Sequence, residues 1–355
     1  MLTSTPSYTA VKQVSKYKIT DVDFNALTFG EVFTDHMYQC TFKDGKWQKP
    51  SIVPYGDITL SPATKVFHYG QAVFEGMKAY KDASGDVFLF RPEENFKRIN
   101  ASSKRMAIPE FPKNYFFEAL DLLLNLDKDW IQTGTANALY IRPFVMATQI
   151  GVSASVSNAY TFYIIMCPVS AYYNKPLRVV VAEQYSRSAD GGVGYAKAAG
   201  NYGAQFYPTQ LARDKGFDQV IWTDSNTHNY LEEAGTMNIF FRINNTLVTA
   251  PTSERILDGI TRKSVLELAT HLGISCEVRP LTISEIVEAA TNGTLKEIFG
   301  SGTAAVISPV EAFNYRDTTY ELPIVTEGYA TQLKTHLIGI QHNLKPDPFG
   351  WKYKI

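Results

Sequence analysis

Cysteine is scarce in this chain. Its 355 residues contain three cysteines, Cys40, Cys167 and Cys276, which lie far apart. Such a set provides neither a disulfide framework nor a Cys-x-x-Cys metal or redox pair, and it is typical of a reducing compartment. The six histidines are equally scattered, so we expect no metal site.

An excess of positive charge and a long hydrophobic run are also missing. Lys and Arg total 34 against 35 Asp and Glu, which leaves little positive charge for a phosphate backbone, so nucleic acid is not an expected partner. The most apolar stretch, residues 161–173, is too short to span a bilayer and contains Pro168. The N-terminal residues lack the patterns of signal and transit peptides. We therefore expect a cytoplasmic protein without a membrane segment.

Several catalytic motifs are absent. A dinucleotide-binding fingerprint after Gly192 and Gly194 would require glycine at the position of Lys197. There is no Gly-Lys-Ser/Thr phosphate loop, no His-Glu-x-x-His helix and no Gly-x-Ser-x-Gly elbow. Nucleotide hydrolysis, zinc proteolysis and α/β-hydrolase chemistry therefore have no support in the sequence.

Hydrophobic periodicity predicts a mixed α/β (α+β) protein with two domains. A strand is expected over 31–42, helices over 93–106 and 114–130, and strands over 137–147 and 159–169, which together form a small domain over 1–168. A proline-containing linker is expected at 169–178. The second domain, 179–355, should contain strands at 177–187, 218–224, 237–243, 246–251 and 296–309, and helices at 202–216, 261–273 and 283–292. Thr282 and Glu285 form a capping-box pattern before the last of these helices.

A single lysine stands in a run of small residues. Residues 191–203 read GGVGYAKAAGNYG, and the small neighbours of Lys197 would let a bulky group approach the backbone. A partly desolvated lysine is suited to form an imine with a carbonyl compound. Taken alone, such a run is more often a solvated glycine loop that carries a surface lysine.

Carboxylates and glycines elsewhere add to this pattern. Glu232 and Glu233 precede the strand at 237–243, and a buried carboxylate there would need a positive partner such as a protonated pyridine nitrogen; a surface acid is the alternative. Gly259 permits an unusual backbone angle just before a helix, whose N-terminus favours phosphate, although a simple helix cap explains it equally well. The run from Gly300 to Thr303 offers a second turn of amides and hydroxyls. An imine-forming lysine, a carboxylate for a ring nitrogen and two phosphate nests are together the requirements of pyridoxal 5'-phosphate.

The order of these motifs resembles the class IV aminotransferases and, more narrowly, the branched-chain amino acid aminotransferases. The resemblance rests on the segments at 197–202, 233–240, 257–262 and 300–304, and it extends through 29–37, 67–80, 89–99, 140–143 and 167–173. It implies a fold type IV pyridoxal phosphate enzyme with a small N-terminal α/β domain and a larger C-terminal pseudobarrel domain, acting as a homodimer.

The resemblance also implies roles for individual residues. Lys197 would bind the cofactor and act as general acid and base at the substrate Cα. Glu233 would keep the pyridine nitrogen protonated, and Tyr202 would donate a hydrogen bond to the phenolic oxygen. The cofactor phosphate would be bound by Arg98, Ile260, Thr261 and Thr303.

The substrate pocket implied by the resemblance is mostly aromatic. It should accept a branched side chain and also the side-chain carboxylate of glutamate. Tyr69 is expected from the other subunit, and Arg142 would help to hold the glutamate carboxylate, with a structural ion pair as its alternative. The amides of Thr236 and Ala304, together with Tyr140, would receive the α-carboxylate. The pocket positions are Phe29, Tyr69, Phe74, Tyr140, Arg142, Tyr172, Thr236 and Ala304.

The reaction implied by the resemblance is reversible transfer of the amino group of leucine, isoleucine or valine to 2-oxoglutarate. A D-amino acid aminotransferase or an aminodeoxychorismate lyase of the same fold is the nearest alternative, and a catalytically silent cofactor-binding protein is another. The full-length match argues against the first two, and the presence of both Lys197 and Glu233 argues against the third.

The sequence predicts an enzyme that is insensitive to mild oxidation. Mammalian members of the family carry a Cys-x-x-Cys pair where this chain has Ala305 and Ser308. Aminotransferase activity should therefore be unchanged after treatment with dilute hydrogen peroxide. A loss of activity that dithiothreitol restores would contradict this prediction and would implicate one of the three scattered cysteines.

Overall fold

The computed structural model describes residues 8–170 and 175–355, which fall into two compact units. Unit 1 contains the described residues of 1–171 together with 196–199 and 340–355, and unit 2 contains those of 172–195 and 200–339. The predicted linker at 169–178 includes residues 171–174, which lie outside the described residues, so the predicted domain boundaries stay a prediction. Within the described part of the chain, no helix has the length and apolar character needed to cross a membrane.

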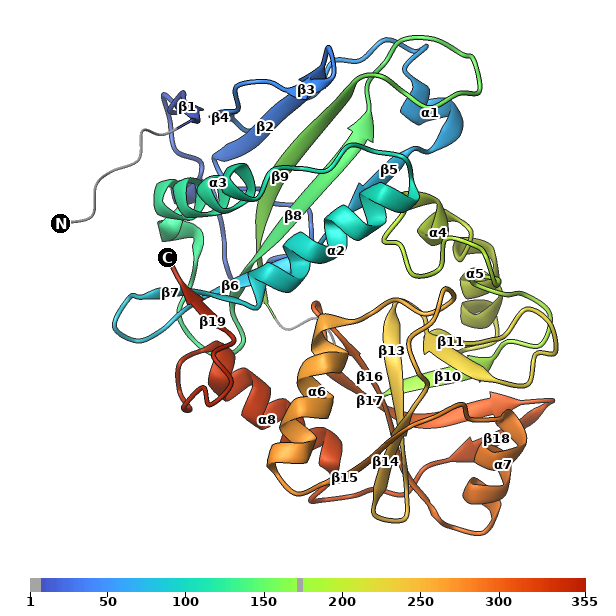
Figure 1. Ribbon diagram of the computed structural model, residues 1–355. Helices are drawn as coiled ribbons and strands as arrows, with labels where there is room; N and C mark the ends of the chain where they lie inside the picture. Colours follow the sequence, from blue (N-terminus) through green and yellow to red (C-terminus); the bar gives the residue numbers. More distant parts are fainter. Residues whose placement is uncertain (1–7, 171–174) are drawn as a thin grey trace. The chain divides into compact units, whose positions relative to one another are not determined.

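Unit 1 is built on a ten-stranded sheet (Figure 1). Its centre is the antiparallel pair β8 (Ala138–Ala147) and β9 (Tyr160–Val169), and the strand order is β1-β4-β2-β9-β8-β6-β7-β19. Two short strands pair off this path, β3 with β2 and β5 with β8. The other strands are β1 (Ala10–Val11), β2 (His36–Lys43), β3 (Lys46–Trp47), β4 (Ser51–Pro54), β5 (Ala72–Phe74), β6 (Met77–Lys81), β7 (Val87–Phe90) and β19 (Lys352–Lys354).

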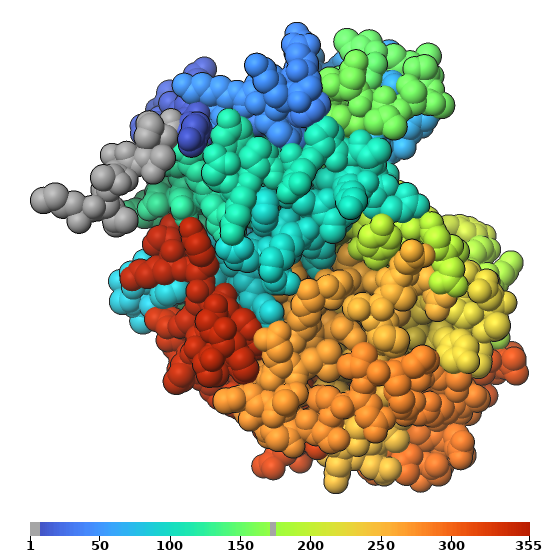
Figure 2. Space-filling model, viewed as in Figure 1, coloured from blue at the N-terminus to red at the C-terminus, as the bar shows by residue number. Residues whose placement is uncertain are grey.

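Two amphipathic helices, α2 (Pro92–Arg105) and α3 (Lys113–Leu126), lie across one face of this sheet (Figure 1). Proline at the first helical position, acids in the first turn and bases in the last turn all favour α2. The outward sides of both helices form part of the surface of unit 1 (Figure 2). The shorter helical segments of this unit are η1 (Ile19–Asp21), α1 (Lys65–Tyr69) and η2 (Lys128–Trp130).

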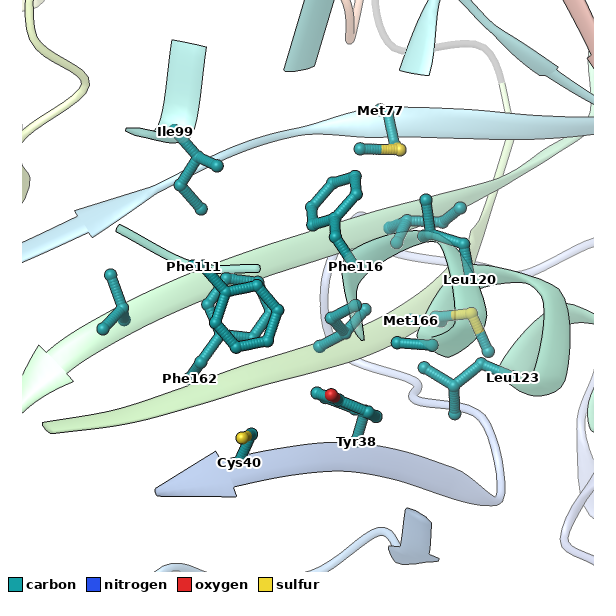
Figure 3. Packing of buried hydrophobic residues seen from close by; sticks show 14 of the residues in the cluster. Tyr38, Cys40, Met77, Ile99, Phe111, Phe116, Leu120, Leu123, Phe162 and Met166 are labelled. Atoms are coloured by element: carbon teal, nitrogen blue, oxygen red, sulfur yellow. The ribbon is translucent and has the colours of Figure 1, made fainter. Parts of the chain in front are cut away.

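The core of unit 1 lies between these helices and the sheet. Figure 3 shows Ile99 of α2 and Phe116 and Leu120 of α3 facing side chains of the strands. Phe111 stacks on Phe162 of β9 with a ring separation of 3.7 Å. Because all of these side chains are buried, removal of apolar surface from water is the main force that holds α2 and α3 on the sheet.

Unit 2 contains a closed barrel. Its nine-stranded sheet runs β12-β11-β10-β17-β16-β13-β14-β15, and an additional pairing of β12 with β13 closes a ring of β10, β11, β12, β13, β16 and β17. The pseudobarrel expected from the family resemblance is therefore confirmed. The strands are β10 (Leu177–Val181), β11 (Gln219–Thr223), β12 (Leu231–Ala234), β13 (Met237–Ile243), β14 (Thr246–Thr249), β15 (Ser275–Val278), β16 (Leu295–Gly302), β17 (Val306–Tyr315) and β18 (Thr318–Glu321).

Helices pack on the strands of unit 2. Helix α5 (Phe206–Asp214) packs on β11, α6 (Ile260–His271) on β15 and β16, and α7 (Ile283–Thr291) on β16. Thr282 caps α7 by accepting a hydrogen bond from the backbone N–H of Glu285, as the capping-box pattern predicts. The side chain of Glu285 pairs instead with Arg279, because a guanidinium provides a stronger partner than a backbone amide.

The structure changes several of the predicted elements. The strand predicted over 177–187 ends at Val181 as β10, and the helix predicted over 114–130 ends at Leu126 as α3. Strand β2 begins at His36, so residues 31–35 are not part of the strand predicted over 31–42. The single helix predicted over 202–216 is two helices, α4 (Ala199–Gly203) and α5, and α5 ends at Asp214. The run at 296–309 contains two antiparallel strands, β16 and β17, joined by a turn at 303–305, which periodicity could not separate because both strands are apolar.

The last residues of the chain complete unit 1. Helix α8 (Tyr329–Gln341) is followed by His342, and β19 pairs with β7 at the edge of the ten-stranded sheet. The ring of His342 packs edge-on against Tyr80 of β6, with 4.8 Å between ring centroids. Burial, with a smaller contribution from the positive charge of Lys78, lowers the pKa of His342 to about 4.

We predict that His342 makes unit 1 sensitive to acid. The unfolded chain binds a proton at this imidazole below pH 6.5, whereas the folded chain does so only near pH 4, so its contribution to stability is lost as the pH falls between these values. On a shift from pH 7 to pH 4.5, the unfolding free energy of His342→Gln should therefore fall by roughly 1–2 kcal/mol less than that of the wild type. Urea titrations at both pH values measure the difference.

Candidate active site

Lys197 is held against the edge of unit 1 by its backbone. Its N–H donates to the Ser102 hydroxyl at 2.9 Å, and its carbonyl accepts the N–H of Phe74 at 3.1 Å. The flanking residues Ala196 and Ala198 are buried in the core. The small residues of this run therefore serve to seat the backbone, which excludes a freely solvated loop at Lys197.

The ring of Phe74 contacts both the lysine side chain and a guanidinium. The Nζ atom of Lys197 lies 4.8 Å from the ring centroid of Phe74, and the guanidinium carbon of Arg142 lies 4.6 Å from the same centroid. Arg142 Nη2 donates to the Tyr140 hydroxyl at 3.0 Å. The structure thus brings four of the predicted residues of unit 1 into one cluster of contacts.

Arg142 keeps unused hydrogen-bonding capacity. Its Nε atom is buried and has no hydrogen-bond partner among the described residues, and no carboxylate within that part of the chain forms an ion pair with it. The structural ion pair considered as its alternative role is therefore not formed there. A buried donor without a partner is costly, so this side chain is suited to accept an anion.

Arg98 is not the solvated surface charge that its helix would suggest. Its Nε donates to Glu75 Oε1 at 2.6 Å and its Nη2 donates to Glu75 Oε2 at 2.9 Å. Glu75 is fully buried and its partner is nearly so, with 11% of the Arg98 side chain exposed. A bidentate pair of this kind holds the guanidinium in one plane.

The other predicted pocket residues of unit 1 are more exposed. Phe29 is 39% exposed and packs edge-on against Tyr140, with 5.1 Å between ring centroids. Tyr69 is 42% exposed, and its hydroxyl donates to the carbonyl of Val152. Tyr172 lies outside the described residues.

Glu233 is buried in the barrel of unit 2. It lies on β12, is 3% exposed and forms an ion pair with Arg187 Nη1 at 2.8 Å. Its other oxygen accepts a hydrogen bond from Asn238 Nδ2 at 3.0 Å. The surface alternative for this carboxylate is therefore wrong, and the positive partner that its burial requires is present. Glu232, the preceding residue, is also buried and pairs with Arg255 at 2.5 Å.

Asn238 connects Glu233 to the start of α6. Its Nδ2 atom also donates to the carbonyl of Leu257 at 2.9 Å, and a Cβ at Gly259 would lie 1.9 Å from its Oδ1 atom. Gly259 has φ −70° and ψ 127°, so the unusual backbone angle expected there is wrong. Glycine is required because the side chain of Asn238 approaches the backbone too closely for a Cβ.

The N-terminus of α6 is suited to bind an anion. Gly259 is its N-cap and supplies no side-chain hydrogen bond, so the first N–H groups of the helix are not capped by that residue. Ile260 and Thr261, the first two helical residues, are largely buried, which strengthens the interaction of their amides with a negative charge.

The remaining predicted residues of unit 2 lie in turns and in α4. Thr303 and Ala304 are half-buried in the turn between β16 and β17. In the antiparallel pairing of β16 with β13, Ser301 lies opposite Asn238. The turn that follows β16 therefore lies next to the start of β13. Thr236 is exposed in the turn between β12 and β13, and Tyr202 is half-buried in α4.

Three residues that organise these groups are not predicted from the sequence. Glu75 and Asn238 lie inside the segments that carry the family resemblance, and a buried-polar interpretation of those segments could have singled them out. Arg187 lies ten residues before Lys197 with no local pattern around it, so only the fold shows its contact with Glu233.

Comparison with known proteins identifies the family of this chain. Residues 72–313 match the family model described as amino-transferase class IV. A branched-chain-amino-acid aminotransferase 2 of Bacillus subtilis strain 168 is 42% identical over 354 residues, covering 97% of this chain and 98% of that protein. This chain belongs to the branched-chain aminotransferases of class IV. A probable branched-chain-amino-acid aminotransferase of Staphylococcus aureus strain N315 is 45% identical over 335 residues, covering 93% of both chains.

Solved structures of branched-chain aminotransferases share the fold. The Escherichia coli enzyme superposes with a TM-score of 0.73 at 24% identity, covering 90% of this chain and 98% of that one. The branched-chain amino acid aminotransferase of Thermobaculum terrenum, solved in its PLP-form, superposes with a TM-score of 0.73 at 21% identity, covering 89% of this chain and 97% of that one.

The thiols of this chain are poorly suited to redox chemistry. Burial raises the pKa of Cys40 to about 12 and that of Cys167 to about 11. It also raises the pKa of Cys276, which is half-buried. Because the thiolate is the reactive form, all three raised pKa values lower the reactivity with peroxide.

We predict that Gly76→Ala damages the cluster around Tyr140. A Cβ at residue 76 would lie 2.1 Å from the Tyr140 hydroxyl, so the ring must move and its hydrogen bond with Arg142 must break. The unfolding free energy should fall by about 1–3 kcal/mol, as for other overpacked sites, and kcat/KM for leucine should fall at least about tenfold. Adding Tyr140→Phe should recover part of the stability.

Gly56→Ala is the matched control for this substitution, because a Cβ there meets no atom within 4 Å. Unchanged stability and activity in Gly76→Ala would contradict the close approach seen between residues 76 and 140.

Proposed function

We propose that this chain transfers the amino group of leucine, isoleucine or valine reversibly to 2-oxoglutarate, with pyridoxal 5'-phosphate as cofactor. Membership of the branched-chain aminotransferases over nearly the whole chain supports this function. The observation that carries it is the placement of Lys197, whose backbone is seated between buried alanines while its amino group lies beside Phe74.

The described residues fit the charges and functional groups of this cofactor. An N-terminus of α6 without a side-chain cap suits a phosphate, and the Glu233 carboxylate suits a protonated ring nitrogen. When bound, the cofactor supplies an aldehyde that reacts with an amine and a ring that accepts electrons. The phosphate-binding residues in this proposal are Arg98, Ile260, Thr261 and Thr303.

Lys197 is the residue that moves protons. Its amine would take the proton from the substrate Cα and return it during the reverse half of the reaction. Glu233 would hold a proton at the ring nitrogen, and its ion pair with Arg187 supports this role because the arginine favours the ionised carboxylate. Tyr202 would donate a hydrogen bond to the phenolic oxygen of the cofactor.

The substrate pocket in this proposal accepts two kinds of side chain. Its apolar surface for a branched side chain would come from Phe29, Phe74 and Tyr140. Arg142 would bind the side-chain carboxylate of glutamate or 2-oxoglutarate. The buried Nε atom of Arg142, which has no partner among the described residues, supports this dual specificity. We assign the α-carboxylate of the substrate to Tyr140 and to the amides of Thr236 and Ala304, and we include Tyr172 in the pocket from the family resemblance.

We further propose a homodimer in which Tyr69 of one subunit reaches the substrate of the other. Support comes from the exposed apolar side chains around it, since Phe67 is 61%, Ile150 is 68% and Val152 is 65% exposed. Exposed apolar side chains gathered in this way are typical of a protein interface.

We predict that sodium borohydride fixes the cofactor to Lys197. Peptide mapping of the reduced protein should place the pyridoxyl group there, and a label on another lysine would remove Lys197 from the mechanism. Lys197→Ala should retain the fold and lose transamination of leucine with 2-oxoglutarate, because no base then remains at the substrate Cα. Lys215→Ala, at an exposed site, is the control and should keep full activity.

The same assay separates the alternatives. Turnover of D-alanine in place of leucine would indicate a D-amino acid aminotransferase, and formation of pyruvate from aminodeoxychorismate would indicate the lyase. A labelled Lys197 without any turnover would indicate a silent cofactor-binding protein.

A further inference from the structure

Glu75 is a fully buried carboxylate on the connection between β5 and β6. It lies one residue after Phe74, and it accepts two hydrogen bonds from Arg98, at 2.6 and 2.9 Å. Asn95 Nδ2 donates to its Oε2 atom at 2.7 Å, and the backbone N–H of Gly76 donates to the same atom at 3.1 Å. A carboxylate buried this completely is stable only when several donors satisfy it, and these contacts meet that requirement.

Two cations act on this carboxylate. Burial alone raises the pKa of Glu75, but the charge and hydrogen bonds of Arg98, the charge of Lys197 and the hydrogen bond from Asn95 outweigh it and lower the pKa. Glu75 is therefore ionised at neutral pH. Because the interaction between two charges is mutual, the same carboxylate stabilises positive charge at both the arginine and the lysine.

The surroundings of Glu75 hold few other charged groups. Helix α2 contributes Arg98, the segment 196–199 contributes Lys197, and β8 contributes Tyr140 and Arg142. The Arg142 guanidinium lies over the ring of Phe74, and its Nη2 bonds to Tyr140. Among the described residues these contacts include no second carboxylate, so Glu75 supplies the negative charge of this cluster.

We propose that Glu75 is a positioning residue that holds the Arg98 guanidinium in one orientation for phosphate. Its negative charge, one residue along the chain from the Phe74 ring that the Lys197 amino group contacts, also favours positive charge at that nitrogen. This inference rests on the proposed function, in which Arg98 binds the cofactor phosphate and Lys197 binds its aldehyde. The two effects have different requirements. Orientation requires a side chain of the length of glutamate, because both oxygens must reach Arg98, whereas the effect on Lys197 requires the charge alone.

Two substitutions separate these requirements. Glu75→Gln preserves length and removes the charge, and its amide places a donor against the donors of Arg98 and Asn95. Glu75→Asp preserves the charge but is one methylene shorter, so it cannot keep both hydrogen bonds to Arg98. Lys97→Gln changes a charge at an exposed position of the same helix and is the control.

The experiment uses the holoenzyme and two readouts besides activity. The first is the pH midpoint of the visible absorption change of the cofactor bound at Lys197, and the second is the affinity of the apoprotein for pyridoxal 5'-phosphate. In Glu75→Gln the midpoint should fall by about one pH unit, because the positive charge at the lysine nitrogen loses its partner. In Glu75→Asp the midpoint should stay within about 0.3 units of the wild type, while the affinity falls at least about tenfold.

The outcomes are distinguishable. An unchanged midpoint in Glu75→Gln, or an unchanged affinity in Glu75→Asp, overturns the role of Glu75 while the proposed function stands. Wild-type protein that takes up no cofactor at Lys197 overturns the proposed function itself, and the inference with it. If Glu75→Gln lacks a folded circular-dichroism spectrum, Glu75→Asp decides the inference by its affinity and midpoint together.

Discussion

Each unit of this protein buries a carboxylate that would be unstable there without a guanidinium beside it. In unit 1 the pair is Glu75 with Arg98, and in unit 2 it is Glu233 with Arg187. Breaking such a buried pair typically costs 3–5 kcal/mol, on the order of a large part of the stability of a domain. Replacing it by apolar residues is often neutral, so stability alone does not explain why the charges are retained. Glu75 follows Phe74, whose ring contacts the Lys197 amino group, and Glu233 is linked through Asn238 to Leu257 before α6, which supports the chemical use proposed for these charges.

The neighbours of these pairs are determined by the same constraint. Asn238 donates hydrogen bonds to Glu233 Oε1 and to the carbonyl of Leu257, and its close approach excludes any side chain at residue 259. Asn95 plays the corresponding part for Glu75. In both cases a neutral amide donates a hydrogen bond to the carboxylate without cancelling its charge. Amides placed in this way hold a buried charge in a fixed position, which a solvated carboxylate would not have.

Local patterns were sufficient to predict much of the fold. The periodicity of 93–106 and 114–130 corresponds to α2 and α3, since their apolar faces are buried on the sheet. Period and composition could not predict the division of 296–309 into two strands, because both are apolar and the turn between them contains alanine. The sequence also could not show why residue 259 must be glycine, because the requirement comes from the side chain of Asn238, twenty-one residues earlier.

Some site residues could be predicted from the sequence and others could not. Lys197, Glu233 and the start of α6 are marked by local composition, because each needs small or polar neighbours in the chain. Arg187 is recognisable only once the fold brings it beside Glu233, and the partners of Glu75 on α2 are likewise visible only in the structure. Residues that contact a ligand often carry a local pattern, whereas the residues that support them are selected by three-dimensional neighbours.

The segment 196–199 has a consequence for how this chain can be divided. It lies in the sequence between two stretches of unit 2, yet its alanines are part of the core of unit 1, and the last residues of the chain add the edge strand β19 to the same unit. A fragment that ends at residue 170 therefore lacks a part of its own core and one of its own strands. Neither unit is encoded by one continuous stretch, so a single crossover between homologous genes cannot exchange one whole unit and leave the other intact.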